Sequence, residues 1–280
     1  MFVVIGATGI IGREVVSQLN RAGAQVTAVS RVAANAALLK SVRVIEGDPS
    51  IAKIPEEVWR DAHAVLLSSR AVTESASDIL TAARAHGVRR VVVVSAATVA
   101  YPAGEPRFIA GFTALEAAAE ASGLAWTVLR CADFAANALA WVPQLRGGDV
   151  VRGAYGSAAT SPIHECDIAT MAVRALAEDG HAGRRYVLTG PTSLNQYEKV
   201  RILGEVTGRE LSFVEIAPEQ VRASMTAQGL PEEIPDRLLG SLADYVRRPG
   251  PTTDTVAELL GRPALSFTTW AAEHVSAFLN

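Results

Sequence analysis

The chain has 280 residues, of which 49% are hydrophobic and 20% are charged, and its formal net charge is −3. This length suits one large α/β domain, or a core domain with a smaller lobe. The longest apolar runs, at 64–67 and 91–94, are far shorter than the roughly 20 residues that cross a bilayer, so no membrane segment is expected. Charged residues are dispersed and nearly balanced, which argues against a nucleic-acid partner.

The cysteines indicate the redox environment of the protein, and the histidines bear on whether it has a metal site. Cys131 and Cys166 are the only cysteines and lie far apart, and no basic segment with a cleavage site precedes the strand-like run at Phe2. We therefore expect a reduced, cytoplasmic protein in which each cysteine is a small buried residue. The five histidines show no paired ligand spacing, so no metal site is predicted.

Strand-like and helix-like segments alternate through the first half of the chain. The apolar, β-branched runs predict strands at 2–5, 25–30, 42–46, 64–68, 90–95 and 126–130. The segments between them have helical spacing and predict helices at 11–21, 33–39, 52–60, 75–86 and 108–122. This alternation is typical of an α/β fold with a doubly wound parallel sheet and helices on both faces.

The pattern of apolar and glycine residues changes after residue 130. Residues 131–163 have less regular apolar spacing and are richer in glycine. The later segments predict helices at 167–178, 194–208, 218–247 (interrupted at Pro231 and Pro235) and 268–279, and strands at 185–189 and 211–216. We expect residues 1–150 to form the dinucleotide-binding core. Residues 151–280 would complete that core and form a smaller C-terminal α/β lobe that covers the substrate at the C-terminal edge of the sheet, where open α/β folds bind ligands.

The most informative motif is the glycine-rich turn after the first strand. In Gly6-Ala-Thr-Gly9-Ile-Ile-Gly12, the first glycine allows a tight turn, the second lets a pyrophosphate approach the backbone and the third lets the helix pack closely on the sheet. The start of the helix then offers backbone N–H groups and a positive dipole end to the phosphates. The motif predicts a Rossmann dinucleotide site formed by Gly6, Thr8, Gly9, Ile10, Ile11 and Gly12.

The end of the second strand indicates which cofactor fits. An acid there would accept hydrogen bonds from the ribose of NAD, whereas an arginine pairs with the 2′-phosphate of NADP. This chain has Ser30-Arg31 and no acidic residue between Glu14 and Glu46, which favours NADP(H) bound by Arg31. Asp48 follows the third strand, where it would receive the adenine amino group or, alternatively, cap a turn.

Several motifs beyond the glycine turn are similar to those of one family. They are Gly47-Asp48, Ser122-Gly-Leu-Ala-Trp-Thr-Val-Leu-Arg130, Phe134-x-x-Asn137, Asp167-Ile-Ala169, Tyr186-x-Leu-Thr-Gly-Pro191 and Leu260-Gly-Arg-Pro263. With the glycine turn, they resemble the NmrA-like family of atypical short-chain dehydrogenases over nearly the whole chain. That family includes NADPH-dependent quinone reductases, isoflavone-type reductases and redox-sensing regulators without turnover. The resemblance implies nicotinamide-side contacts near Ser68, Ser69, Arg70 and Ser95.

The usual catalytic set of short-chain dehydrogenases is missing. Those enzymes use a tyrosine, a lysine four residues later and a serine to protonate and hold the carbonyl oxygen. Here no lysine lies between Lys53 and Lys199, and Ala96 falls at the usual serine position. Three hypotheses follow. The protein transfers a hydride to an acceptor that needs little acid catalysis, or Tyr101 or His164 supplies the proton, or the protein binds NADP without catalysing a reaction.

We favour an enzyme that uses NADPH to reduce a small quinone-like or conjugated carbonyl substrate. The alternative is a non-catalytic NADP-binding redox sensor or regulatory protein. Tyr101 and His164 are the candidate catalytic residues, although each has a structural alternative as a strand-end or hydrogen-bonded residue. The candidate substrate-binding residues lie on the fifth helix or after the sixth strand: Phe112, Glu116, Arg130, Phe134, Asn137 and Trp141.

Overall fold

The computed structural model describes residues 1–33, 36, 38–72 and 74–279, and the chain divides into two compact units. Unit 1 comprises residues 1–99, 110–131 and 165–187, and unit 2 comprises residues 100–109, 132–164 and 188–280. The chain therefore passes between the units several times. The expected boundary at residue 150 lies inside unit 2.

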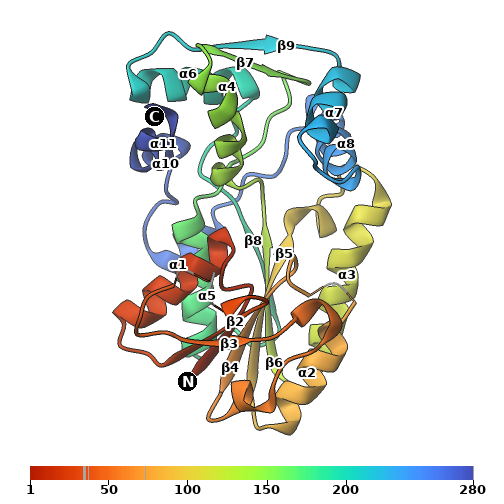
Figure 1. Ribbon diagram of the computed structural model, residues 1–280, viewed down its shortest axis with the longest axis vertical. Coiled ribbons are helices and arrows are strands. Elements are labelled where there is room, and N and C mark those ends of the chain that lie inside the picture. The colour runs from red at the N-terminus through yellow and green to blue at the C-terminus, as the bar shows by residue number, and fades with distance from the viewer. Residues whose placement is uncertain (34–35, 37, 73, 280) are drawn as a thin grey trace. The chain divides into compact units, whose positions relative to one another are not determined.

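A seven-stranded sheet contains the strands of unit 1 (Figure 1). Its strands are β1 (Phe2–Ile5), β2 (Val26–Ser30), β3 (Arg43–Glu46), β4 (Ala64–Ser68), β5 (Arg90–Ala96), β6 (Ala125–Cys131) and β8 (Arg184–Leu188), in the order β3-β2-β1-β4-β5-β6-β8. β1 pairs in parallel with both β2 and β4, so the strand order reverses there. Such a reversal is where doubly wound folds bind dinucleotides, and the predicted doubly wound parallel sheet is confirmed.

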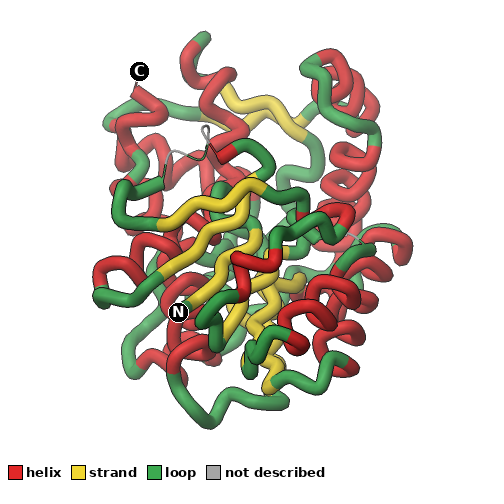
Figure 2. The backbone as a smooth tube through the Cα atoms, turned by 60° about the horizontal axis from the view of Figure 1, so that its bottom comes forward, coloured by secondary structure: helices red, strands yellow, loops and turns green. Residues whose placement is uncertain are grey.

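Helices cover both faces of this sheet (Figures 1 and 2). They are α1 (Ile10–Arg21) and α5 (Glu165–Ala177) on one face, and α2 (Ala76–Ala85) and α3 (Pro106–Ala121) on the other. Alternate strand residues such as Val3 and Ile5 share a buried core with Ile79 of α2 and Leu115 of α3. Their neighbour Val4 is also fully buried. Burial on both faces explains why the strands read as continuous apolar runs.

Several expected elements differ in the structure. The helix expected at 52–60 is wrong. The 3₁₀ turn η2 (Pro49–Ile51) ends before this stretch at Ala52, whose φ is 55°, and a second 3₁₀ turn, η3 (Glu56–Trp59), begins only after Pro55. The element expected at 33–39 includes residues 34, 35 and 37, which lie outside the described residues. Pro235 does not interrupt its helix, because it falls in the first turn, where proline is tolerated.

Unit 2 has its own sheet and core. A parallel pair joins β7 (Val150–Gly153) to β9 (Ser212–Glu215), and β7 was not expected from the sequence. The helices wholly within this unit are α4 (Val142–Arg146), α6 (Gln196–Thr207), α7 (Pro218–Ala227), α8 (Glu233–Arg247), α9 (Thr255–Leu260), α10 (Phe267–Glu273) and α11 (Val275–Leu279). Unit 2 also holds the 3₁₀ segment η5 (Ala135–Trp141), whereas the 3₁₀ segment η4 (Ala97–Val99) belongs to unit 1. Aromatic residues of the last two helices, Trp270 and Phe278, pack with Leu203 of α6. The helix expected at 268–279 is thus two helices that meet at His274.

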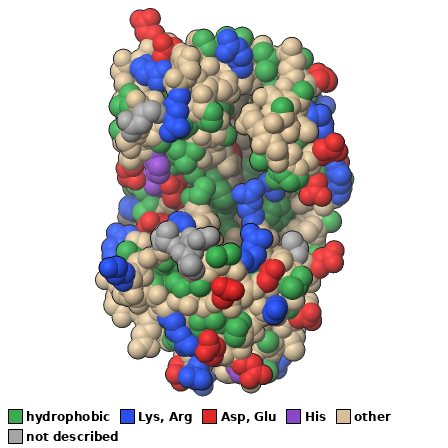
Figure 3. Space-filling model, viewed as in Figure 1, with side chains coloured by type: hydrophobic (Ala, Val, Ile, Leu, Met, Phe, Trp, Pro, Cys, Tyr) green, Lys and Arg blue, Asp and Glu red, His purple; other side chains and the backbone are tan. Residues whose placement is uncertain are grey.

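The surface and the cysteines complete the description. Figure 3 shows acidic and basic side chains interspersed over the visible face. Across the described part of the chain, no helix is both long and apolar enough to cross a membrane. Cys131 is buried as expected, whereas Cys166 is only half-buried and lies 3.6 Å from the Gln18 amide nitrogen.

Candidate functional site

The glycine turn of unit 1 is held by backbone contacts that only glycine permits. Gly6 has φ 91°, and the Gly9 N–H donates to its carbonyl at 3.0 Å. A Cβ on Gly12 would lie 2.1 Å from that same carbonyl oxygen, and a Cβ on Gly6 would lie 2.7 Å from the Ser68 Cβ. The first and third glycines are therefore required by the close approach of helix, turn and strand.

The beginning of α1 fits the phosphates of a dinucleotide. Gly9 is the N-cap and carries no side chain that could accept from the helix, and the first turn holds no acidic residue. Thr8, Gly9 and Ile10 are exposed, and the first N–H groups of the helix lack acceptors within it. A pyrophosphate would satisfy these donors and interact favourably with the positive end of the helix dipole.

The end of β2 presents Arg31 beside Asp48. Arg31 is exposed and its positive charge acts on the Asp48 carboxylate. That carboxylate accepts from the Ser50 hydroxyl at 2.6 Å and from the Ser50 N–H at 3.0 Å. The hydroxyl bond is the main reason that the pKa of Asp48 lies below its ordinary value. Asp48 therefore caps η2, and a further role toward adenine stays a prediction.

The end of β4 lies against the glycine turn. Ser68 and Ser69 are half-buried and Arg70 is exposed, and the Ser68 carbonyl accepts from the N–H groups of Ala71 and Val72. This turn places Ser68 directly on Gly6. The structure thus joins the predicted nicotinamide-side segment to the predicted phosphate turn within one unit.

Ser95, Glu116 and Arg130 form one buried polar network. Ser95 and Arg130 are paired in register on β5 and β6, so both side chains reach Glu116 on α3. The Ser95 hydroxyl donates to Glu116 Oε1 at 2.6 Å, and Arg130 donates to both carboxylate oxygens, with Nη2 at 2.7 Å from Oε2. Only 4% of the Glu116 side chain is exposed. The sequence suggested three separate ligand contacts, whereas the structure joins these residues to one another.

Tyr101 lies in unit 2, just beyond η4, and is 45% exposed. It lines a cavity of about 270 Å³ formed by residues 100–103 and by the end of α8 with the segment that follows it. The other lining side chains include Tyr245, Asp244 and Arg248. The sequence did not indicate these three residues, because α8 is more than 130 residues away from Tyr101 along the chain.

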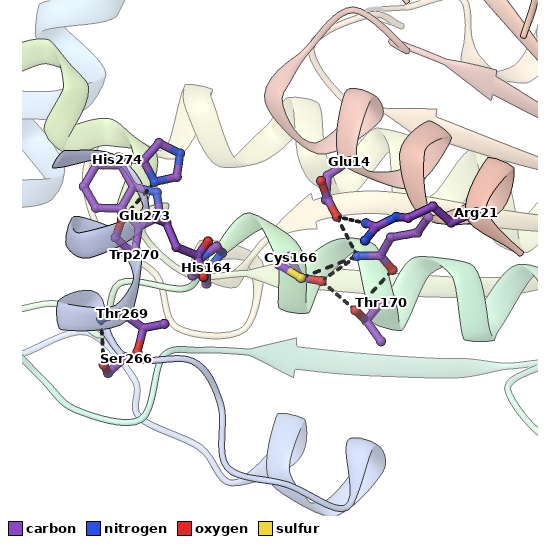
Figure 4. Close-up of polar contacts among 11 residues, drawn as sticks. Glu14, Arg21, His164, Cys166, Thr170, Ser266, Thr269, Trp270, Glu273 and His274 are labelled. Carbon is purple, nitrogen blue, oxygen red and sulfur yellow. Dashed lines mark hydrogen bonds and ion pairs between the residues drawn. The ribbon is translucent and has the colours of Figure 1, made fainter. Parts of the chain in front are cut away.

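His164, the second catalytic candidate, is engaged elsewhere in unit 2 (Figure 4). It is 2% exposed, and its Nε2 lies 3.2 Å from an oxygen of Glu273 on α10. The neighbouring His274 stacks on Trp270 with ring centroids 4.5 Å apart. His164 does not line the Tyr101 cavity. Its contact with Glu273 matches the structural alternative of a hydrogen-bonded residue, and a catalytic role for His164 stays a prediction.

A buried ion pair that the sequence did not indicate lies beside Asn137. The Lys199 ammonium donates to Asp133 Oδ2 at 2.9 Å and to the Thr160 hydroxyl at 2.7 Å. Asp133 also accepts from the Asn137 amide at 2.7 Å. Burial raises the pKa of Asp133, but the charge of Lys199 and these hydrogen bonds outweigh it and hold the pKa below its ordinary value. One feature of the sequence could have drawn attention to this ion pair: Lys199 is the only lysine after residue 53.

The three aromatic substrate candidates are half-buried. Phe112 lies on α3, Phe134 caps η5 and bridges to Ile163, and Trp141 packs against the core of unit 2. Asn137 is exposed. Among the described residues, no group of three or more His, Cys, Asp or Glu side chains is placed to hold a metal ion.

Comparison with known proteins shows the family of the chain. The NAD(P)H-binding family model matches residues 6–179, which is more than half of the chain. The chain belongs to the NAD(P)H-binding family. The resemblance that the motifs indicated is thereby confirmed, and the matched range includes the glycine turn, Arg31 and Ser95.

Curated relatives span the whole chain. The protein is 33% identical to (4-alkanoyl-5-oxo-2,5-dihydrofuran-3-yl)methyl phosphate reductase of Streptomyces griseus over 99% of both chains. It is 31% identical to NAD(P)H azoreductase of Xenophilus azovorans, again over 99% of both chains. A solved structure of the Escherichia coli quinone oxidoreductase QOR2 with NADPH shares the fold, with a TM-score of 0.80, 23% identity and full coverage of both chains. The protein is therefore an NAD(P)H-dependent oxidoreductase.

Proposed function

We propose that this protein uses NADPH to reduce a small conjugated carbonyl compound, such as a quinone or an unsaturated lactone. The observation that carries the proposal is the pairing of an uncapped phosphate turn and an exposed Arg31 with the lysine gap from 54 to 198. The first two features favour NADPH. The lysine gap favours an acceptor whose reduction needs no dedicated acid.

The cofactor-binding steps follow from residues of unit 1. The N–H groups that open α1 would bind the pyrophosphate, and Arg31 would form a bidentate pair with the 2′-phosphate. Ser68, Ser69 and Arg70 extend from the strand next to Gly6 and would contact the nicotinamide side. The bound cofactor supplies a hydride. Buried Ser95 donates its hydrogen to Glu116, so we assign Ser95 a structural role in the network that it forms with Glu116 and Arg130.

The proton is the step that distinguishes this protein from a typical short-chain dehydrogenase. A hydride adds two electrons to the conjugated acceptor, and one proton from water completes the reduction. In a conjugated acceptor the negative charge that develops is spread over the conjugated system, so the oxygen is a weak base and water suffices. Relatives named as acting on a furanone phosphate ester and as a quinone oxidoreductase support this class of acceptor.

A panel of acceptors tests the proposal. NADPH oxidation would be followed by absorbance with quinones, enones, unsaturated lactones and an azo dye, and with saturated ketones of matched size. We expect turnover with conjugated acceptors and little with saturated ketones, and no turnover with Gly9→Val. Equal rates for saturated ketones would overturn the assignment of the acceptor, and cofactor binding without turnover across the panel would overturn the proposed reaction.

A further inference from the structure

The cavity of unit 2 combines groups that recognise an anion with groups that recognise neutral oxygen. Its walls bring together two phenols, Tyr101 and Tyr245, one guanidinium, Arg248, and one carboxylate, Asp244, while prolines and small residues form the rest. Its volume of about 270 Å³ is near the lower end for small-molecule sites, which range over roughly 300–1,000 Å³. The size and lining suit a small polar ligand.

The lining carboxylate Asp244 is acted on by the positive charges of two arginines, Arg247 and Arg248, so the three groups together carry one positive charge in excess. Both oxygens of Asp244 are already engaged, one by the Gly104 N–H at 2.8 Å and the other by Arg247. The backbone bond from Gly104 is the main reason that the pKa of Asp244 lies below its ordinary value. Arg248 donates one N–H to the Pro102 carbonyl at 3.2 Å. In the described parts of the chain, no ion pair joins Arg248 to a carboxylate.

The two phenols add hydrogen-bond donors beside this cation. Burial, with the nearby charges of Asp133 and Asp244, raises the pKa of Tyr245 to about 12, so its hydroxyl stays protonated at neutral pH. Within the described residues, neither the Tyr101 nor the Tyr245 hydroxyl has a hydrogen-bond partner. Two donors and a guanidinium fork in one small cavity match a ligand rich in oxygen atoms.

We propose that this cavity selects substrates that carry an oxyanion, either a phosphate ester or a carboxylate, which pairs with Arg248 while Tyr101 and Tyr245 donate to neighbouring oxygen atoms. This inference rests on the proposed function and deepens it, because it restricts the conjugated acceptor to an anionic one. The guanidinium fork binds both oxyanions through parallel N–H···O bonds. The experiment below determines whether the cavity prefers the phosphate ester or the carboxylate.

The test uses three ligands that differ only in one group: an unsaturated five-membered lactone with a hydroxymethyl substituent, its phosphate ester and the corresponding carboxylate. Dissociation constants would be measured by calorimetry for the full chain and for Arg248→Met and Arg248→Lys. Arg201→Gln is the matched control, because Arg201 is an exposed arginine of the same unit that pairs with Glu205 and does not line the cavity. NADPH oxidation would be followed with the same ligands.

We expect the dissociation constant of at least one oxyanionic ligand to be lower than that of the alcohol by a factor of about 10 or more. Arg248→Met should abolish that preference without weakening the alcohol, Arg248→Lys should restore part of it, and Arg201→Gln should leave it unchanged. Equal affinity for all three ligands, absence of binding, or an equal loss for alcohol and anion in Arg248→Met would overturn the inference. Anion-selective binding without NADPH oxidation would refute the proposed function alone, whereas oxidation without selectivity would refute this inference alone.

Discussion

The buried pair of Lys199 and Asp133 gives a sharp stability prediction. Only 5% of the Lys199 side chain and 25% of the Asp133 side chain are exposed. Lys199→Met keeps the apolar stem but leaves the Asp133 carboxylate without its countercharge. Removing one partner of a buried pair costs about 3–5 kcal/mol. Because a quarter of Asp133 reaches solvent, we expect the lower end, about 3 kcal/mol.

Urea unfolding followed by tryptophan fluorescence would measure this loss in the wild type, Lys199→Met, Asp133→Asn and the double variant. The double variant should be more stable than the sum of the two single losses predicts, by about 1 kcal/mol or more. A loss below about 0.5 kcal/mol in Lys199→Met, a size typical of surface substitutions, would refute the assignment of a buried, mutually dependent pair.

The same pair makes a pH prediction of definite sign. Because the folded protein holds the pKa of Asp133 below its ordinary value, the carboxylate stabilises the fold above the unfolded pKa of about 3.9. That contribution is lost as the pH falls through the lower folded pKa. The stability difference between wild type and Lys199→Met should therefore shrink in acid, and a difference that grows in acid would contradict the assignment.

Three further predictions concern the site. Arg31→Ala should weaken NADPH binding about 10-fold or more and leave NADH almost unchanged, and equal losses by calorimetry would refute the phosphate assignment. Gly12→Ala should lose NADPH affinity and stability together, since its Cβ would lie 2.1 Å from the Gly6 carbonyl oxygen, and wild-type values for both would contradict the described turn. Tyr101→Phe should lower turnover by less than about 10-fold, whereas a loss of the size typical of general acid catalysis, about 10²–10⁴-fold, would show that Tyr101 donates the proton.

Elements that depend on local pattern were predictable from the sequence. The glycine turn, β1 and α1 arise from consecutive residues whose spacing and backbone requirements are visible in the chain. The apolar spacing of 52–60 predicts a helix, whereas Ala52 at φ 55° and Pro55 at the start of η3 give this segment a different backbone.

Contacts between distant segments were not predictable in the same way. Ser95 and Arg130 meet only because β5 and β6 are paired in register, and Glu116 reaches them from a helix. Lys199 and Asp133 are separated by 66 positions. Nothing in the local sequence of either residue indicates its partner, because such pairs depend on how the elements pack.

The most direct test of the central claim follows the hydride itself. NADPH carrying deuterium at the transferable position of the nicotinamide would be incubated with an unsaturated lactone or a quinone, and the product examined by mass spectrometry and NMR. With the lactone, we expect one deuterium on a carbon of the reduced ring, delivered by the wild type and not by Gly9→Val. With the quinone, we expect stoichiometric hydroquinone. Consumption of NADPH without reduced acceptor, or a lactone product free of deuterium, would contradict direct hydride transfer to a conjugated carbonyl compound.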